Sequence, residues 1–262
     1  MGKEQPIGIF DSGVGGTSIW KEIHSLLPFE QTLYLADSVN APYGEKPRQE
    51  IIDLSVKNTR RLLEMGSKLI VVACNTATTN AIKHLRAEFN VPFIGIEPAI
   101  KPAALSSKTR VIGILATRGT LSSELFAETS DLYSQHAKVV EVVGTGLVKA
   151  IERGEKDAPA TEQLLRRLLD PMMEANIDYL VLGCSHYPYL IPLLKKMLPE
   201  GVKIIDSGQA VANQTKNVLE KLDLLADAPQ AAPEFFSNAD PATLRSLVCP
   251  SGEAYEVNFL DF

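Results

Sequence analysis

Two cysteines, Cys74 and Cys184, each close a short apolar run, and each is followed two residues later by a polar side chain, Thr76 or His186. A fold that holds one thiol on each side of a cleft can take a proton from one face of a carbon and return a proton to the other face. Such a pair of thiols inverts a stereocentre. The two cysteines therefore predict an acid–base site with a thiol on each of two opposite walls.

The two cysteines belong to a longer internal repeat. Strand-like runs recur in the same order with shifts between 112 − 7 = 105 and 184 − 74 = 110 residues. The recurring runs are 7–10 with 112–115, 32–37 with 138–143, 69–74 with 179–184, and 92–97 with 202–207. This period is too long for a solenoid, so we expect two similar α/β units.

The apolar runs must be the elements that position the cysteines. They are short, rich in Ile and Val, and apolar on both faces, which is typical of buried parallel strands. The expected strands are 7–10, 32–37, 69–74, 92–97, 111–117, 138–143, 179–184 and 202–206, and the clearest helical patterns are 48–65, 76–89, 121–132, 161–175 and 209–225. Their alternation predicts an α/β fold with right-handed βαβ units and mostly parallel open sheets.

The repeat also predicts a division into two domains. Pro98 and Pro102 interrupt the pattern after Glu97, and a second boundary falls near Ser207. The tail beyond the loop at 226–233 has no repeat partner, so we expect it to fold back onto the first unit. The predicted domains are 1–97 plus 208–262, which is discontinuous, and 98–207, with the active site in the cleft between them.

Ligands of open parallel sheets bind at the carboxyl ends of the strands. Polar or thiol side chains occupy these ends in both predicted units. They are Asp11, Asp37, Cys74, Thr117, Cys184 and Asp206. The predicted topology therefore gathers chemistry-bearing residues at one edge of each sheet.

Composition narrows the function classes. The chain has 262 residues, 45% hydrophobic residues and a formal net charge of −6, which argues against binding to nucleic acid or to an anionic membrane surface. No apolar stretch approaches the ~20 residues of a spanning helix. Three cysteines do not make a disulfide framework. We therefore expect a cytoplasmic protein whose thiols stay reduced.

The segment from Asp11 to Gly16 follows the first expected strand and opens a helix. Its glycines allow tight turns and a close approach of the backbone to a ligand, and amides at a helix N-terminus suit a carboxylate. The segment does not fit the dinucleotide-binding pattern. Taken alone, it is equally compatible with a plain tight turn.

Each cysteine lies in a context that favours acid–base chemistry. Cys74 precedes a helix whose dipole favours a thiolate, and Asn75 and Thr76 supply donors for a carboxylate. In the second unit, His186 can help Cys184 to lose or regain a proton. A third cysteine, Cys249, lies in the unmatched tail, and we interpret it as structural. The sequence contains no metal-ligand spacing and no lysine in a phosphate-cradling context, so we expect neither a metal nor a cofactor.

These motifs together resemble the glutamate racemases of the aspartate/glutamate racemase superfamily. The matching segments are FDSGVGG at 10–16, NAPYG at 40–44, ACNTAT at 73–78 and GCSHYP at 183–188. One departure is Ser185, where the family usually carries threonine. The resemblance implies a cofactor-free, two-base interconversion of L- and D-glutamate, in which D-glutamate supplies peptidoglycan synthesis.

The resemblance also implies roles for individual residues. Cys74 and Cys184 correspond to the paired acid/base groups, with Cys74 serving D-glutamate and Cys184 serving L-glutamate. Asp11 and His186 correspond to the polar groups that assist these two thiols, and Glu152 to a third assisting acid. The implied substrate-binding residues are Asp11, Ser12, Tyr43, Gly44, Asn75, Thr76, Thr117, Ser185 and His186. A small-molecule substrate and a homodimer complete the implied picture.

Two other functions stay open at this point. A relative in the same superfamily could act on aspartate or on another amino acid, although the segments at 11–16 and 40–44 favour glutamate. A one-cysteine decarboxylase is disfavoured because both cysteines are present. In a different class, Cys74 and Cys184 could form a switchable disulfide in a redox sensor, but their separate strand–helix contexts argue against it.

Overall fold

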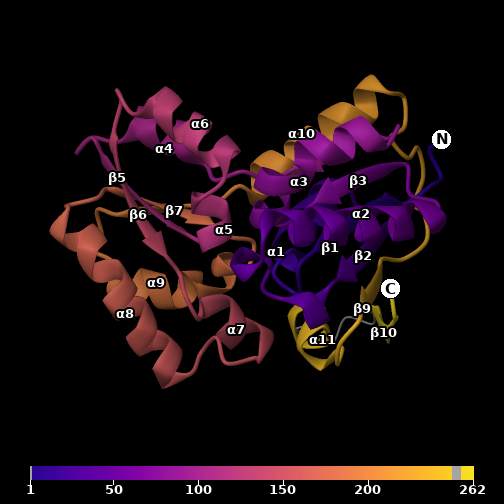
Figure 1. Cartoon of the computed structure of the whole chain (residues 1–262). Helices are drawn as coiled ribbons and strands as arrows, with labels where there is room; N and C mark the ends of the chain where they lie inside the picture. The colour runs from indigo at the N-terminus through magenta and orange to yellow at the C-terminus, as the bar shows by residue number, and fades with distance from the viewer. Residues whose placement is uncertain (1, 250–254) are drawn as a thin grey trace.

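The strands form two parallel sheets that lie side by side in this computed structural model, which describes residues 2–249 and 255–262. The larger sheet has the order β10-β9-β2-β1-β3-β4, and the smaller has the order β6-β5-β7-β8 (Figure 1). The strands are β1 (Ile7–Asp11), β2 (Thr32–Ala36), β3 (Leu69–Val72), β4 (Phe93–Gly95), β5 (Val111–Ala116), β6 (Lys138–Val143), β7 (Tyr179–Gly183), β8 (Lys203–Ile205), β9 (Glu234–Ser237) and β10 (Glu256–Phe259).

Helices connect the strands and cover both sheets. They are α1 (Thr17–Leu26), α2 (Arg48–Glu64), α3 (Asn75–Glu88), α4 (Ile100–Ser106), α5 (Arg118–Leu121), α6 (Glu124–Tyr133), α7 (Leu147–Glu152), α8 (Pro159–Glu174), α9 (Ile191–Met197), α10 (Gly208–Lys221) and α11 (Ala242–Val248). The helix expected at 121–132 is instead two helices, because the Ser123 hydroxyl caps a new N-terminus by accepting the amide of Phe126. Each helix in the described part of the chain is too short or too polar to cross a bilayer.

The strand order repeats between the two sheets. Four strands of the first sheet have the order β2-β1-β3-β4, and the second sheet has the same order with each strand number raised by four, β6-β5-β7-β8. Neighbouring strands in both orders are parallel. The predicted α/β class with parallel open sheets is confirmed. The internal repeat is therefore a repeat of topology.

Side chains that alternate along the strands fill a core on each side of each sheet. In the first sheet, Ile9 and Val71 pack with α1 and α10, whereas Phe10 and Val72 pack with α2 and α3. The second sheet is likewise covered by α4 and α6 on one face and by α7, α8 and α9 on the other. Burial of both faces explains why the strands read as continuous apolar runs.

We call the part built on the larger sheet the first lobe and the part built on the smaller sheet the second lobe. The chain crosses between them near Glu97 and again near Ser207, and the Ser207 hydroxyl donates a hydrogen bond to the Glu97 carbonyl oxygen. The tail adds β9 and β10 to the edge of the first sheet. The domain boundaries at 97/98 and 207/208 stay a prediction, and residues 1 and 250–254 of the predicted first domain lie outside the described residues.

The strand order fixes where a ligand can bind. In each sheet the order reverses between two central strands, β1 and β3 in the first lobe and β5 and β7 in the second. A crevice opens at such a reversal, beyond the carboxyl ends of the strands. Cys74 follows β3 and Cys184 follows β7, so each cysteine lies at the reversal point of its own sheet.

Candidate active site

Cys74 forms one wall of the site at the junction of β3 and α3. It is the N-cap residue of α3, and its sulfur accepts the backbone N–H of Ala77 at 3.5 Å. Its thiol donates to the hydroxyl of Ser12 at 3.6 Å. Burial, followed by the nearby charge of Asp11, raises the pKa of the Cys74 thiol well above its ordinary value. In this state Cys74 is a neutral thiol that is ready to give a proton.

Cys184 forms the opposite wall directly after β7. Its sulfur lies 3.9 Å from Nδ1 of His186, and Nε2 of His186 lies 2.5 Å from Oε1 of Glu152. Burial lowers the pKa of His186, but the bonds to Cys184 and Glu152 and the charge of Asp11 outweigh burial, so this pKa lies well above its ordinary value. The imidazolium can therefore hold and pass a proton beside Cys184.

Asp11 lies at the end of β1, between the two walls. Its Oδ1 accepts the Ser185 hydroxyl at 3.0 Å, and its Oδ2 lies 3.9 Å from Nδ1 of His186. Burial raises the pKa of Asp11, and the charge of His186 opposes that rise. Oδ2 of Asp11 also accepts the backbone N–H of Gly13 at 3.1 Å. The side-chain partners of Asp11 are thus on the Cys184 wall, and its influence on Cys74 is electrostatic. Its expected role as the assistant of Cys74 stays a prediction.

The glycine loop after β1 fits tightly against the second lobe. A Cβ atom placed on Gly13 would lie 1.9 Å from Oε1 of Glu152, and one placed on Gly15 would lie 2.1 Å from Nδ1 of His186. A side chain at either position would displace these two groups. The loop therefore needs glycine for close approach, which a plain tight turn would not require.

Glu152 joins the two lobes at the site. It ends α7 of the second lobe, and its Oε1 accepts the backbone N–H of Val14 at 2.7 Å. Its Oε2 accepts the hydroxyl of Ser38 at 3.1 Å. Because the same carboxylate also pairs with His186, the loops of the first lobe help to hold this imidazole in place.

Asn75 and Thr76 supply the polar groups on the Cys74 side. Asn75 is 2% exposed, and neither its Nδ2 nor its Oδ1 has a hydrogen-bond partner among the described residues. A buried amide without partners is costly. Its position next to Cys74 suits a ligand that brings both a donor and an acceptor.

Three threonine hydroxyls meet where the lobes join. Thr76 Oγ1 lies 2.8 Å from Thr117 Oγ1 and 3.3 Å from Thr120 Oγ1, and the last two atoms are 3.0 Å apart. Sequence reasoning missed Thr120. The signal that could have found it is its position three residues after Thr117, where it falls in the first turn of the helix that Thr117 caps.

The loop at 40–44 contributes its backbone. The Tyr43 hydroxyl donates to Oδ2 of Asp37 at 2.5 Å and accepts Nδ2 of Asn58 at 2.9 Å, so the phenol is held in the core. Gly44 faces Thr117, and a Cβ atom on Gly44 would lie 2.6 Å from the Cβ of Thr117. Because the phenol is engaged in the core, only the main chain of Tyr43 is available to bind a substrate. Thr117 of the second lobe packs directly against Gly44.

The predicted site residues therefore fall into one connected group across the two lobes. All of them are placed in the described part of the chain, at or just after the ends of β1, β3, β5 and β7, on the 3₁₀ turn Tyr43–Glu45, or on α7. Cys249 lies outside this group, at the end of α11, where it packs against the core. Among the described residues, no group of three or more His, Cys, Asp or Glu side chains is arranged to hold a metal ion.

Comparison with known proteins agrees with this geometry. The sequence profile of the Asp/Glu/hydantoin racemases matches residues 12–215. The chain belongs to this racemase family. Among curated members, the glutamate racemase of Ectopseudomonas mendocina is 44% identical over 246 residues, which cover 94% of each chain.

Solved racemase structures share the whole fold. Glutamate racemase isoform RacE1 of Bacillus anthracis superposes with a TM-score of 0.89 at 30% identity and covers 99% of this chain and 98% of its own. The Escherichia coli glutamate racemase, solved with L-glutamate and the activator UDP-MurNAc-ala, has a TM-score of 0.87 at 34% identity and 97% coverage of both chains. The two-lobed arrangement is thus that of the racemase family.

Proposed function

We propose that this protein interconverts L- and D-glutamate without a cofactor, using Cys74 and Cys184 as a pair of acid/base groups. The observation that carries the proposal is the placement of the two thiols at matching reversal points of two repeated sheets, each with polar partners of its own. The high similarity to proteins named glutamate racemase supports glutamate as the substrate.

The direction from L- to D-glutamate starts at the Cys184 wall. Cys184, as a thiolate whose proton has passed to His186, takes the α-proton of L-glutamate, so a C–H bond breaks and an S–H bond forms. The neutral thiol of Cys74 then gives its proton to the opposite face of the α-carbon. Its S–H bond breaks and a new C–H bond forms, which yields D-glutamate. The reverse direction runs through the same two thiols with their roles exchanged.

The α-proton is a very weak acid, so the site must stabilise the charge that develops on the substrate. Polar groups that are fixed in a site without water and point at that charge usually make the largest contribution to stabilising the transition state. In our proposal the amide of Asn75 and the hydroxyls of Thr76 and Ser185 bind the α-carboxylate and amino group. Further binding groups are Asp11, Ser12, the backbone of Tyr43 and Gly44, Thr117, Thr120 and His186.

The biological setting is part of the same proposal. D-glutamate supplies peptidoglycan synthesis, the enzyme works in the cytoplasm, and two copies form a homodimer, as the resemblance to the family implies. Sedimentation of the purified protein tests the dimer. A sedimentation coefficient of a single chain would exclude it.

A direct assay tests the activity. Pure D-glutamate should lose its optical rotation when the protein is added without any cofactor, and aspartate should not. In heavy water, product formed early should carry solvent deuterium at the α-position, because the donating thiol has exchanged, while recovered substrate should carry little. Extensive early label in the substrate, with none preferred in the product, would indicate a one-base mechanism and contradict the proposal.

The redox-sensor alternative makes a different prediction. A sensor would lose two thiols reversibly under mild oxidation as its function. Racemisation would then be absent from the fully reduced protein.

A further inference from the structure

The two catalytic thiols are almost sealed from solvent. Cys74 is 4% exposed and Cys184 is 6% exposed. A substrate of glutamate's size cannot reach both sulfurs in this conformation, so the two lobes must part to admit it. The contacts that hold the lobes together at the mouth of the site then decide how often the site opens.

Two surface hollows flank the closed site. The first touches Gly44 and Thr117, and the second touches Val14, Ser38 and Glu152. Three residues line both hollows and so lie between them, and these are Pro42, Val148 and Lys149. This ridge is where the loop of the first lobe meets α7 of the second lobe.

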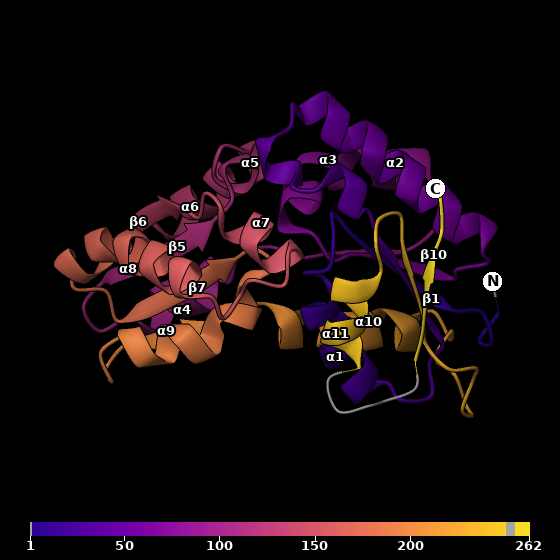
Figure 2. The same cartoon turned by 90° about the horizontal axis from the view of Figure 1, so that it is seen from below.

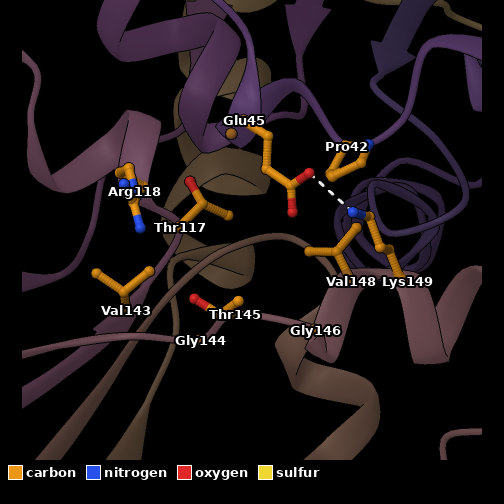
Figure 3. A pocket seen from close by; sticks show the side chains of 11 residues that line it. Pro42, Glu45, Thr117, Arg118, Val143, Gly144, Thr145, Gly146, Val148 and Lys149 are labelled. Atoms are coloured by element: carbon orange, nitrogen blue, oxygen red, sulfur yellow. Dashed lines mark hydrogen bonds and ion pairs between the residues drawn. The ribbon is translucent and has the colours of Figure 1, made fainter.

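An ion pair spans this ridge from one lobe to the other. The Nζ atom of Lys149 on α7 lies 2.8 Å from the carboxylate of Glu45, which belongs to the short 3₁₀ turn Tyr43–Glu45. Figure 3 shows the two charged groups meeting at the edge of the first hollow, between Pro42 and Val148. Both side chains are about half exposed, at 50% and 52%, so water can replace the pair when it breaks.

The ridge lies away from the chain crossings. The crossings run through Glu97 and Ser207, next to α4 and α10. Figure 2 shows α5 and the start of α10 at opposite ends of the boundary between the lobes, and α5 contacts the 3₁₀ turn that carries Glu45. Opening about the crossings would therefore separate Glu45 from Lys149.

We propose that Glu45 and Lys149 form a latch across the mouth of the site, and that release of this latch admits substrate and frees product. The inference rests on the proposed function for its biological meaning, but the latch itself is a property of the empty protein. Glu45 and Lys149 are positioning residues, because they act by holding Gly44 against Thr117 and do not touch the reacting atoms.

Thiol alkylation without substrate tests the latch. In a Cys249→Ser background, which removes the third thiol, we would measure how fast neutral iodoacetamide modifies Cys74 and Cys184. Glu45→Gln and Lys149→Gln should each raise the rate by about two- to five-fold, the range that an exposed ion pair can supply. The exchanged variant Glu45→Lys/Lys149→Glu restores the pair and should return the rate toward that of the parent. Unchanged rates in both single variants would overturn the proposal.

A matched ion pair provides the control. Lys83 on α3 and Glu128 on α6 also pair across the lobes, at 3.6 Å, but they line neither of the two hollows. Lys83→Gln should leave the alkylation rate unchanged. An equal increase in this variant would mean that any loss of a contact between the lobes loosens the protein, and the specific latch would be refuted. Denaturant unfolding of each variant would show whether global stability has changed.

Glutamate kinetics separate the latch from simple attraction of the substrate. If Lys149 only attracts the anionic substrate, Glu45→Gln should lower KM and Lys149→Gln should raise it. A latch predicts that both variants change KM in the same direction and to a similar extent, with no further change in the double variant. Opposite changes in KM would refute the latch. If alkylation responds as expected but glutamate is not racemised, the latch stands and the proposed function fails.

Discussion

The two walls of the active site share a position in the fold but differ in how they support their thiols. Cys74 follows β3 and caps the 14-residue helix α3, so its partners are a backbone amide and the Ser12 hydroxyl. Cys184 follows β7 but caps no helix, because the 3₁₀ turn Tyr187–Leu190 separates it from α9. Its partner is the imidazole of His186, which is paired with Glu152.

This difference shows what a repeated topology does and does not determine. The repeat places both sulfurs at the reversal points of their sheets, where a substrate can reach them. It does not make their proton chemistry equal. A helix N-terminus offers about half of a unit charge, whereas the imidazolium offers a full charge and a proton that can move. We therefore expect proton transfer through Cys184 to depend on side-chain partners more than transfer through Cys74 does.

The largest expected effect is the loss of either thiol. Cys74→Ser and Cys184→Ser should each lower racemisation roughly 10³-fold or more, because a hydroxyl is a far weaker acid than a thiol. Each variant keeps one base, so each should still eliminate a leaving group from an analogue of one enantiomer. The two variants should prefer opposite enantiomers, which chiral analysis of the unreacted analogue would show.

The third cysteine is the control for this comparison. Cys249→Ser should leave kcat/KM for glutamate near that of the parent, since Cys249 lies at the end of α11 and outside the site. If Cys74→Ser and Cys184→Ser preferred the same enantiomer, the two walls would not serve opposite faces of the substrate, and the two-base mechanism would be wrong.

Replacing His186 tests the stronger dependence of the Cys184 wall. His186→Asn should lower kcat roughly 10²- to 10⁴-fold, the usual range for acid–base assistance, and should raise KM less. Both directions share one equilibrium, so kcat/KM must fall by the same factor in each, and only kcat and KM separately can differ. If His186 only packs the strand end, the melting temperature should fall while the folded fraction keeps its kcat/KM.

Removing the charge of Glu152 should have a smaller effect. Glu152→Gln keeps the shape of the side chain but weakens the charge-assisted bond to His186, a bond of about 1.5–3 kcal/mol. We expect kcat/KM to fall about 10- to 100-fold, and the alkaline limb of the pH–rate profile to move to lower pH, because the imidazolium loses its partner. A fall in kcat/KM with an unmoved pH profile would mean that Glu152 only joins the lobes.

The comparison of the walls also shows how far the sequence could predict this molecule. The eight repeated strands follow from their apolar runs, and the two thiols and His186 follow from their places at the strand ends. The tail strands β9 and β10 gave no such signal, because both are short, neither is buried along its whole length, and neither has a repeat partner. The latch residues were equally hidden, since Glu45 and Lys149 come from different lobes, whereas the spacing of Thr120 from Thr117 was a local signal. The inward turn of the Tyr43 phenol depends on Asp37 and Asn58, and no local pattern shows that contact.

The smallest expected effect concerns the Cys74 wall at alkaline pH. An ordinary thiol has a pKa near 9.0, and burial followed by the charge of Asp11 raises that of Cys74 well above this value. Above pH 9 the unfolded chain therefore loses the Cys74 proton while the folded protein keeps it. A group whose pKa is raised by folding gives stability that is present below its unfolded pKa and is lost as the pH rises.

The free energy of unfolding should thus fall with pH above 9 more steeply in the parent than in Cys74→Ser, by up to about 1.4 kcal/mol for each pH unit. Urea unfolding of both proteins between pH 8 and pH 10 measures the difference, and groups common to both proteins cancel. Parallel curves would show that Cys74 ionises as readily in the folded protein as in the unfolded chain. Burial and the charge of Asp11 would then not hold the proton on Cys74, and the description of this wall as a thiol that stays neutral at alkaline pH would be wrong.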